Sequence, residues 1–280
     1  MAVQLEDKVI IVTGTSSGIG NALARVLTDR GATVVGMARR AEPNQSLADE
    51  IAAGGGKFTF MQGDITSTPD CNRVVADTIA QFGRVDVLIN NAAKGTPLMR
   101  MEDYSDEIWD AFHDTTLKGV FRMCRAVVPH MRAAERGLIL SVSSTGGAEG
   151  GACENFSAYG AVKAGVHQLM RVIAIENLDK NVRTSTIVMG GVDTPMAAEA
   201  IEEVTTLQGM GEFVEQAKAA AAGIFMRPEA VARSIAVLCD DDNVEINGAT
   251  IPVDRCWSTG YGVSLIFGSA GSAGVQAAQA

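Results

Sequence analysis

Residues 8–20 read KVIIVTGTSSGIG, a run of β-branched residues that leads directly into a glycine-rich turn. The run 8–13 is apolar on both sides, which is typical of a parallel strand that helices cover on both faces. The segment 21–30 then places apolar residues at helical spacing and stops at Gly31. Glycines let the backbone pass close to a phosphate, and the start of the next helix offers free N–H groups to the anion. A turn of this kind at the first strand–helix junction of a parallel sheet indicates a nucleotide site.

The same alternation of short β-rich runs and longer helical patterns continues along the chain, which is the signature of βαβ units. Further strands are predicted at 32–37, 57–61, 85–89, 137–142, 182–188 and 249–253. Further helices are predicted at 46–53, 68–82, 106–132, 158–178 and 228–239. The sequence therefore predicts an α/β fold, a Rossmann-type, doubly wound parallel sheet of about seven strands with helices on both faces. We expect it to form a single domain over residues 1–257.

Two segments depart from this rhythm. Residues 194–225 are rich in Ala, Met and Gly and carry few strand formers and few charges. We expect one or two mobile helices there, acting as a lid over an apolar or mixed substrate. Residues 258–280 form a tail of Gly, Ser and Ala, for which a disordered or packed terminus is the ordinary interpretation.

The composition excludes several classes of protein. The chain has 280 residues, a formal net charge of −10 and a pI near 4.8, so it offers no basic face to nucleic acid. No apolar stretch reaches the roughly 20 residues of a membrane helix, and the N-terminus lacks the features of a secretion signal. Five cysteines without short spacings predict neither disulfides nor a zinc site. We expect a cytoplasmic protein with no metal, no nucleic-acid partner and no membrane partner.

Tyr159 and Lys163 are four residues apart and fall on one face of a predicted helix. A free tyrosine has a pKa of about 10. A nearby ammonium lowers that pKa by favouring the phenolate, which makes the pair a usable acid and base at neutral pH. The strand at 137–142 leads into the hydroxyls of Ser143 and Ser144, at the edge where open parallel sheets bind ligands. A serine hydroxyl there can hydrogen-bond a carbonyl oxygen as negative charge develops on it.

These motifs follow one another along the chain: the glycine-rich turn, NNA at 90–92, Ser144, and Tyr159 with Lys163. In this order, and over roughly residues 5–257, the chain resembles the short-chain dehydrogenase/reductase family in its ordinary short form. The resemblance implies NAD(P)-dependent hydride transfer between a nicotinamide and the carbon of a carbonyl or alcohol. It also implies a homodimer or homotetramer.

The resemblance assigns roles to individual residues. Tyr159 would exchange a proton with the substrate oxygen, and Ser144 would hold and polarise the carbonyl. Lys163 would bind the nicotinamide ribose and lower the pKa of Tyr159. Ser143 or Thr145 is the alternative to Ser144 as the hydroxyl that faces the substrate. The cofactor-binding residues, besides Tyr159 and Lys163, would be Gly14, Ser16, Ser17, Gly18, Ile19, Gly20, Arg39, Asp64, Ile65, Asn90, Asn91, Val192 and Thr194.

Thr116 stands where the family has a catalytic asparagine, which supports a proton route to the lysine partly through its main-chain carbonyl. Threonine keeps that carbonyl, so we expect a weakened or rewired relay and count Thr116 among the catalytic residues. By the same resemblance, Asn90 lines the cofactor channel, Asp64 hydrogen-bonds the adenine and Thr194 faces the nicotinamide carboxamide. Ala93 adds a Cβ where the family motif has glycine.

The end of the second strand bears on the choice of cofactor. An acidic residue there binds the ribose 2′-hydroxyl of NAD and repels a 2′-phosphate. This chain instead has Ala38 at that position, followed by Arg39, and an arginine can pair bidentately with a phosphate. Against this, Ser17 occupies a turn position at which many NADP enzymes carry a second basic residue. The sequence predicts NADP(H) in preference to NAD(H).

Together these residues predict an NADP(H)-dependent alcohol dehydrogenase or carbonyl reductase that acts on a small-molecule carbonyl or alcohol. The alternative is a catalytically impaired, nucleotide-binding member of the same fold with a regulatory role, because Thr116 and Ala93 depart from the family pattern. The epimerases and dehydratases among the longer relatives fit less well, since they carry a differently spaced glycine motif and a longer C-terminal part.

Overall fold

The computed structural model describes residues 3–95, 97–147, 155–207, 209 and 211–255. Seven parallel strands form one sheet in the order β3-β2-β1-β4-β5-β6-β7. The strands are β1 (Val9–Thr13), β2 (Thr33–Ala38), β3 (Lys57–Gln62), β4 (Val87–Asn90), β5 (Gly137–Ser144), β6 (Val182–Met189) and β7 (Ala249–Val253). Each predicted strand overlaps an observed one, and the predicted doubly wound α/β fold is confirmed.

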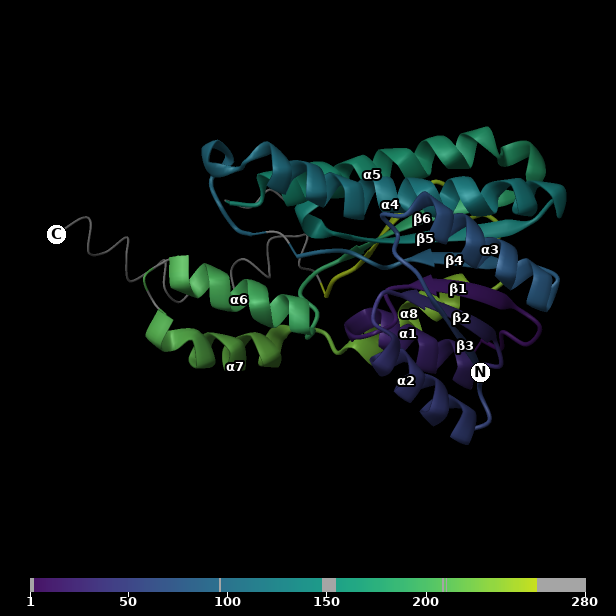
Figure 1. Ribbon diagram of the computed structural model, residues 1–280, viewed down its shortest axis with the longest axis horizontal. Coiled ribbons are helices and arrows are strands. Elements are labelled where there is room, and N and C mark those ends of the chain that lie inside the picture. Colours follow the sequence, from purple (N-terminus) through teal and green to yellow (C-terminus); the bar gives the residue numbers. More distant parts are fainter. Residues whose placement is uncertain (1–2, 96, 148–154, 208, 210, 256–280) are drawn as a thin grey trace.

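Helices cover both faces of the sheet (Figure 1). Eight are α-helices in the described part of the chain: α1 (Gly18–Asp29), α2 (Ala41–Ala53), α3 (Thr68–Phe82), α4 (Asp106–Ala133), α5 (Ser157–Glu176), α6 (Pro195–Leu207), α7 (Val214–Ile224) and α8 (Pro228–Leu238). Short 3-10 turns join them at η1 (Met101–Asp103), η2 (Thr145–Gly147), η3 (Leu178–Lys180) and η4 (Gly211–Phe213). Helices α3, α4 and α5 pack on one face of the sheet, and α1, α2 and α8 pack on the other.

Strand β1 shows why the sequence of the central strands is apolar throughout. Side chains alternate between the two faces along a strand. Ile10 and Val12 therefore join the core beneath α1 and α8, whereas Ile11 joins the core beneath α3, α4 and α5. All three are fully buried, and each such burial contributes roughly 1.5–3 kcal/mol. The strand that leads into the glycine-rich turn is thus fixed from both sides.

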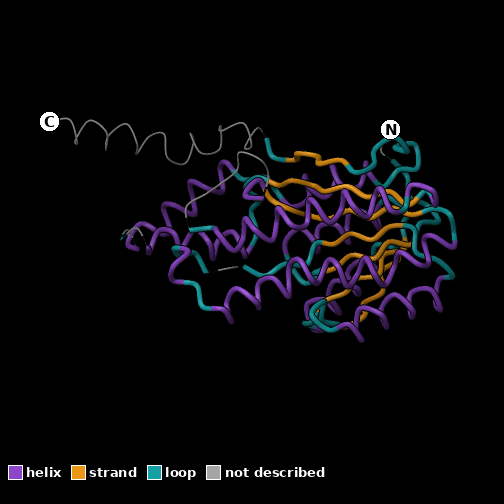
Figure 2. Tube along the Cα trace, turned by 90° about the horizontal axis from the view of Figure 1, so that it is seen from above, coloured by secondary structure: helices purple, strands orange, loops and turns teal. Residues whose placement is uncertain are grey.

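The direction of the winding reverses between β1 and β4. The chain passes from β1 to β2 and β3 on one side, then returns to β4, which pairs with β1 on its other side (Val12↔Ile89). Figure 2 shows the strands lying side by side with loops at their ends. Open α/β sheets bind ligands in the crevice outside the carboxyl ends of the strands at such a reversal. The turn after Thr13 and the segment after Asn90 meet at this point.

Helix α2 begins at Ala41, five residues before its predicted start at residue 46, so that prediction was wrong. Pro43 explains the difference. A proline interrupts a helix in its interior, but it is tolerated in the first turn, where its missing N–H has no intrahelical acceptor. Helix α5 ends at Glu176, slightly earlier than predicted, and the chain continues into η3.

The segment 194–225 forms α6 and α7, joined by η4. Because β6 ends at Met189 and α6 begins at Pro195, these helices leave the carboxyl edge of the sheet, and Figure 1 shows them extending away from it. Their action as a lid stays a prediction. The tail predicted at 258–280 lies outside the described residues. Among the helices that the structure describes, none combines the length and apolar character needed to cross a bilayer.

Candidate active site

Gly14 and Gly18 hold the turn after β1 in left-handed backbone conformations, with φ of +79° and +56°. The turn is also tightly packed. A Cβ placed on Gly14 would lie 2.9 Å from Cα of Ala92, and one placed on Gly20 would collide with the main-chain oxygen of Gly14. The segment after β4 therefore packs closely against the turn, and the lack of a side chain at Gly14 permits this approach. These three glycines were all predicted at the cofactor site.

Asn91 ties the two segments together. Its Nδ2 donates a hydrogen bond of 2.9 Å to the main-chain oxygen of Thr13 and one of 3.4 Å to that of Gly14. The hydroxyl oxygen of Thr13 accepts hydrogen bonds of 3.0 Å from the main-chain N–H groups of Asn91 and Ala92. The predicted cofactor residue Asn91 thus holds the shape of the turn.

Asn90 differs from its neighbour. Its residue is only 3% exposed, and its Nδ2 lies 3.3 Å from Oγ of Ser141 and 3.6 Å from Sγ of Cys124, in the interior between β5 and α4. Adjacent residues of a strand point to opposite faces, so the Asn90 amide is turned away from the glycine-rich turn. The lining role predicted for Asn90 does not extend to its side chain.

The N-terminus of α1 follows the turn directly. Ser17 is the N-cap residue, and its side chain makes no capping hydrogen bond to the first helical turn. The first N–H groups of the helix therefore remain available to an anion, which the helix dipole also favours. Thr194 lies beside this point, because a Cβ on Gly18 would be 3.2 Å from its Cγ2. Oγ1 of Thr194 accepts a hydrogen bond from the N–H of Ala197 and so caps α6.

Ile19 and Val192 are the apolar members of the predicted cofactor set. Ile19 is half-buried in the first turn of α1, against the core of that face. Val192 is buried, and its backbone forms an isolated bridge with Met226. The bridge anchors the chain just before Thr194 and so fixes where α6 departs from the sheet.

Arg40 reaches back to the glycine-rich turn. Its Nη2 donates a hydrogen bond of 2.9 Å to Oγ of Ser16 and lies 3.4 Å from Oγ of Ser17. A second link runs beneath it, since Oγ1 of Thr15 donates to Oδ1 of Asn44 at 2.6 Å and Nδ2 of Asn44 donates to the main-chain oxygen of Arg40 at 2.7 Å. Arg40 is therefore held beside the turn by both its side chain and its main chain.

Arg39, which follows β2 directly, points away from the glycine-rich turn. Its side chain is 76% exposed, and its Nη1 lies 4.0 Å from Oδ2 of Asp64. Neighbouring residues at the end of a strand project in opposite directions, which separates Arg39 from Arg40. The sequence predicts Arg39 at the cofactor site but assigns no role to Arg40, although the adjacent charges are a visible signal.

Asp64 and Ile65 follow β3 at the same edge of the sheet. Oδ1 of Asp64 accepts hydrogen bonds of 2.9 Å from the main-chain N–H and the hydroxyl of Thr66, and Oδ2 faces Arg39. Ile65 is buried under α4, where a Cβ on Gly119 would lie 2.8 Å from its Cδ1. The Asp64 carboxylate therefore lies at the edge of the site, whereas the Ile65 side chain packs into the core against α4.

Tyr159 and Lys163 lie one turn apart on α5, as their spacing predicts. Nζ of Lys163 lies 5.7 Å from the centroid of the Tyr159 ring. Lys163 is 5% exposed, and its Nζ donates a hydrogen bond of 3.2 Å to the main-chain oxygen of Val142. Burial lowers the pKa of Lys163 to about 8, because a low dielectric disfavours the charged form. The helix thus brings a phenol and an easily discharged ammonium to the carboxyl end of β5.

Ser144, the last residue of β5, borders the same space as Tyr159. Its Oγ accepts a hydrogen bond of 3.2 Å from the N–H of Gly146. A Cβ on Gly146 would lie 3.7 Å from that Oγ and 3.3 Å from Cε1 of Tyr159. Gly146 therefore lies close to both residues predicted to be catalytic, and its lack of a side chain avoids a tight contact with the Tyr159 ring.

The two alternative hydroxyls are placed differently. Ser143 is 3% exposed, and its Oγ lies 2.7 Å from Nε2 of His167 on the inner face of α5. Thr145 is also buried, in η2. The hydroxyl of Ser144 lies near Gly146, which also approaches the Tyr159 ring.

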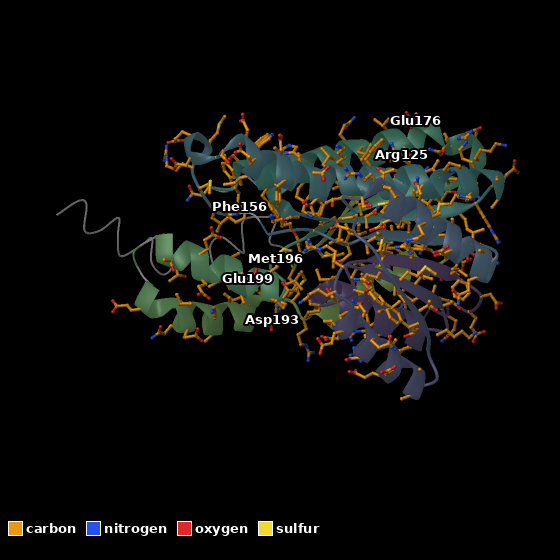
Figure 3. The ribbon with its side chains drawn as sticks, viewed as in Figure 1. Arg125, Phe156, Glu176, Asp193, Met196 and Glu199 are labelled. Carbon is orange, nitrogen blue, oxygen red and sulfur yellow. The ribbon has the colours of Figure 1, made fainter. Side chains whose placement is uncertain are left out.

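Apolar groups surround the Tyr159 ring. Phe112 lies 6.0 Å from it between ring centroids, and Phe156 lies 5.6 Å from it in an edge-on arrangement. Figure 3 places Phe156, at the start of α5, and Met196, at the start of α6, at the same end of the molecule. Met196 also approaches the loop after β4, since a Cβ on Gly95 would lie 3.8 Å from its Cγ.

This geometry can be compared with known proteins. Residues 8–205 match the family model described as short chain dehydrogenase. The chain belongs to the short-chain dehydrogenase family. It is therefore an oxidoreductase by family, and its relatives are named as dehydrogenases and reductases.

Two curated relatives of this short-chain dehydrogenase match it over nearly their whole length. The 3-oxoacyl-[acyl-carrier-protein] reductase FabG of Thermotoga maritima is 33% identical over 253 residues, which cover 90% of this chain and 98% of the relative. The cis-4-hydroxycyclohexanecarboxylate dehydrogenase of Sinomonas cyclohexanicum is 33% identical over 248 residues, which cover 89% and 95%. Among solved structures, a variant of actinorhodin polyketide ketoreductase with NADPH has a TM-score of 0.83 at 28% identity, covering 92% of this chain and 99% of that one.

Thr116, which the sequence predicts at the position of a catalytic asparagine, lies in the interior of α4. The residue is 2% exposed on α4, and its Oγ1 has no hydrogen-bond partner in the part of the chain that the structure describes. A buried hydroxyl without a partner costs about 1–3 kcal/mol, so such groups are rare. The sequence predicts a role for this position but not the isolation of its side chain.

The three cysteines in the described part of the chain are buried thiols. Cys71, Cys124 and Cys239 are buried, and burial raises the pKa of these thiols to about 11, about 12 and about 12. A thiol must ionise to act as a nucleophile. Within the described ranges, no group of acidic, histidine or cysteine side chains could hold a metal ion.

Proposed function

We propose that this short-chain dehydrogenase is an NADP(H)-dependent oxidoreductase that interconverts a carbonyl and an alcohol. The observation that carries the proposal is the meeting of Ser144 and Tyr159 at Gly146, with Lys163 one helical turn further along α5. A hydrogen-bond donor and an acid–base pair at one point are what proton transfer to a carbonyl oxygen requires.

The residues around the glycine-rich turn fit a dinucleotide. The uncapped start of α1 and the three glycines of the turn offer N–H groups and space to a pyrophosphate. Thr194 lies beside Gly18, which supports its predicted contact with the nicotinamide carboxamide. When bound, the nicotinamide supplies a hydride to the substrate carbon or accepts one from it.

In the direction of reduction, Ser144 donates a hydrogen bond to the substrate carbonyl oxygen and holds it next to Tyr159. Tyr159 gives that oxygen its proton as negative charge develops on it. The Lys163 ammonium stabilises the phenolate that remains. With a pKa lowered to about 8, Lys163 can also lose and regain a proton near neutral pH. The main-chain oxygen of Thr116 would then form part of the route by which that proton reaches Lys163.

Two arginines support a preference for NADP(H). No carboxylate stands at Ala38, so nothing at that position repels a 2′-phosphate. Arg39 projects into solvent and Arg40 lies against Ser16, so the two guanidinium groups flank the end of β2. Guanidinium groups bind phosphates through paired hydrogen bonds. The solved ketoreductase with NADPH supports the same direction.

The surroundings of Tyr159 support an apolar or mixed substrate. Phe112 and Phe156 pack against its ring, and Met196 of α6 lies at the same end of the molecule as Phe156. The names of the relatives are consistent with a mixed substrate, since they refer to a 3-oxoacyl group, a hydroxycyclohexanecarboxylate and a polyketide. The segment 194–225 would close over such a substrate.

A catalytically impaired member with a regulatory role is the less supported alternative. It would be favoured by the loss of Ser144, Tyr159 or Lys163, and all three are present. The cytoplasmic location and the homodimer or homotetramer stay predictions from the sequence.

Cofactor oxidation at 340 nm with a carbonyl panel tests the proposal. The purified protein is mixed with NADPH or NADH and with cyclohexanone, a short 3-oxoacyl thioester or a ketose phosphate. We expect turnover with one of the first two substrates, little with the charged sugar, and a kcat/KM for NADPH at least about tenfold above that for NADH, or about 1.4 kcal/mol. Binding of NADPH without turnover on any carbonyl or alcohol would favour the regulatory alternative.

A further inference from the structure

His167 is a buried histidine that the proposed mechanism does not use. It is 6% exposed and lies on α5 two helical turns beyond Tyr159 and one turn beyond Lys163. Residues four apart share a face of a helix, so the imidazole continues the row that begins with the phenol and the ammonium. Buried imidazoles are rare without a partner, and the structure provides one.

The partner is Ser143, on the strand that carries Ser144. Nε2 of His167 and Oγ of Ser143 share a hydrogen bond of 2.7 Å, and Ser143 is 3% exposed. Successive residues of a strand point to opposite faces. A contact that fixes Ser143 against α5 therefore also fixes the direction in which Ser144 points.

A second bond crosses the same interface one residue earlier. Nζ of Lys163 donates to the main-chain oxygen of Val142 at 3.2 Å. Successive turns of α5, at Lys163 and His167, thus contact successive residues of β5, at Val142 and Ser143. The two bonds join the element that carries Tyr159 to the element that carries Ser144.

We propose that His167 is a positioning residue, which through Ser143 holds the end of β5 against α5 and so sets the placement of the Ser144 hydroxyl beside Tyr159. The inference rests on the proposed function. Catalytic groups must be held within a fraction of an ångström of their working geometry, and an imidazole bridging helix and strand directly behind Ser144 provides that constraint.

A role for His167 in carrying protons fits the structure less well. Burial, together with the charges of Arg171 and Lys163 on the same helix, lowers the pKa of His167 to about 4. The ring is therefore neutral under ordinary conditions, and its Nε2 is engaged with Ser143. A neutral imidazole that is hydrogen-bonded to Ser143 holds β5 against α5 but does not carry protons.

Steady-state kinetics of four variants test the proposal with the full-length protein, NADPH and the best carbonyl of the panel. His167→Leu and Ser143→Ala should each lower kcat about 10- to 100-fold, while the dissociation constant of NADPH changes by less than about twofold. The double variant should lose no more than the larger single loss, because both changes remove one contact. His167→Gln, whose amide nitrogen reaches the position of Nε2, should restore most of the rate.

Ser185→Ala is the matched control. Ser185 is a buried serine of β6 whose hydroxyl donates to the main-chain oxygen of Thr184, away from α5. Its kcat should stay at the wild-type value. An unchanged kcat in Ser143→Ala, or losses that multiply in the double variant, would overturn the proposal. If His167→Leu does not fold, Ser143→Ala decides alone.

A second measurement is independent of turnover. The ¹⁵N chemical shift of His167 Nε2 reports its hydrogen bonding, and we expect it to change in Ser143→Ala and to stay constant in Ser185→Ala. An identical shift in Ser143→Ala and the wild type would contradict the contact. If the wild type reduces no carbonyl, the proposed function fails, and the shift still shows whether His167 holds Ser143.

Discussion

Lys163 donates a hydrogen bond from its Nζ to the main-chain oxygen of Val142 at 3.2 Å, although the residue is 5% exposed. Within the described residues, no carboxylate forms an ion pair with this ammonium. A carbonyl compensates only part of the cost of burying a charge. This is why burial lowers the pKa of Lys163 to about 8 from 10.5. The cofactor-free protein carries a lysine that folding disfavours in its charged form.

The lowered pKa of Lys163 predicts how stability depends on pH. Between about pH 8 and 10.5, the unfolded chain holds a proton on this lysine and the folded chain does not. The free energy of unfolding therefore rises with pH across this window, by up to roughly 3 kcal/mol from this group. Urea unfolding of the cofactor-free protein with Lys163 and of Lys163→Met, compared at each pH, isolates that contribution.

The difference in stability between the protein with Lys163 and Lys163→Met should move in favour of the protein with Lys163 as the pH rises from 8 to 10.5. Both proteins carry Tyr159→Phe in this comparison, because the pKa of Tyr159 depends on the nearby Lys163. The other tyrosines and the thiols that titrate in the same range are common to both proteins and cancel in the difference. If the difference in the free energy of unfolding stays constant between pH 8 and 10.5, burial does not lower the pKa of Lys163.

The isolated hydroxyl of Thr116 gives a second prediction. Thr116→Val removes a buried group that has no partner in the described part of the chain, so the free energy of unfolding should rise by about 1 kcal/mol. For a domain of this size that corresponds to a melting temperature about 2–4 °C higher. Valine keeps the main-chain carbonyl, so kcat should remain close to the wild-type value.

Thr78→Val is the matched control for Thr116→Val. Thr78 is equally buried, but its hydroxyl donates to the main-chain oxygen of Val74 at 2.6 Å. Removing that hydroxyl should lower stability by about 1 kcal/mol. If both variants lose stability to the same extent, the Thr116 hydroxyl forms a hydrogen bond in solution.

We expect Arg40 to contribute more than Arg39 to the preference for NADPH over NADH. Because the guanidinium of Arg40 is already held at Ser16, Arg40→Ala should raise the KM for NADPH about tenfold and leave that for NADH nearly unchanged. Arg39, which is exposed and faces Asp64, should show a smaller change in Arg39→Ala. Steady-state kinetics with both cofactors measure the ratio. Equal effects on NADPH and NADH would mean that Arg40 only supports the turn.

The fold was predictable because its pattern is local. Apolar runs such as 8–13, separated by helical segments, specify parallel strands and crossover helices without any knowledge of long-range contacts. The start of α2 was misjudged because Pro43 is disfavoured inside a helix but tolerated in its first turn. The composition of 41–45 does not show which of the two applies.

The sequence predicts on which elements the candidate site residues lie, but it does not predict the direction that each side chain takes. Tyr159 and Lys163 follow from helical spacing, whereas Asn90 and Arg40 depend on which face of a strand end each side chain takes. The motif contains both Asn90 and Asn91, but it does not show which of the two side chains faces the glycine-rich turn. His167 lies beyond such reasoning, because its role arises from the register between α5 and β5, which the sequence of neither element contains.

The most direct test of the proposed chemistry is the rate of NADPH-dependent carbonyl reduction by Tyr159→Phe, with NADPH binding followed by the fluorescence of the bound cofactor. Tyr104→Phe is the control, since Tyr104 donates its hydroxyl to the main-chain oxygen of Pro97. We expect kcat to fall about 10²- to 10⁴-fold in Tyr159→Phe, with NADPH affinity retained, and to change little in Tyr104→Phe. A Tyr159→Phe protein that reduces its substrate at the wild-type rate would contradict the assignment of the proton donor.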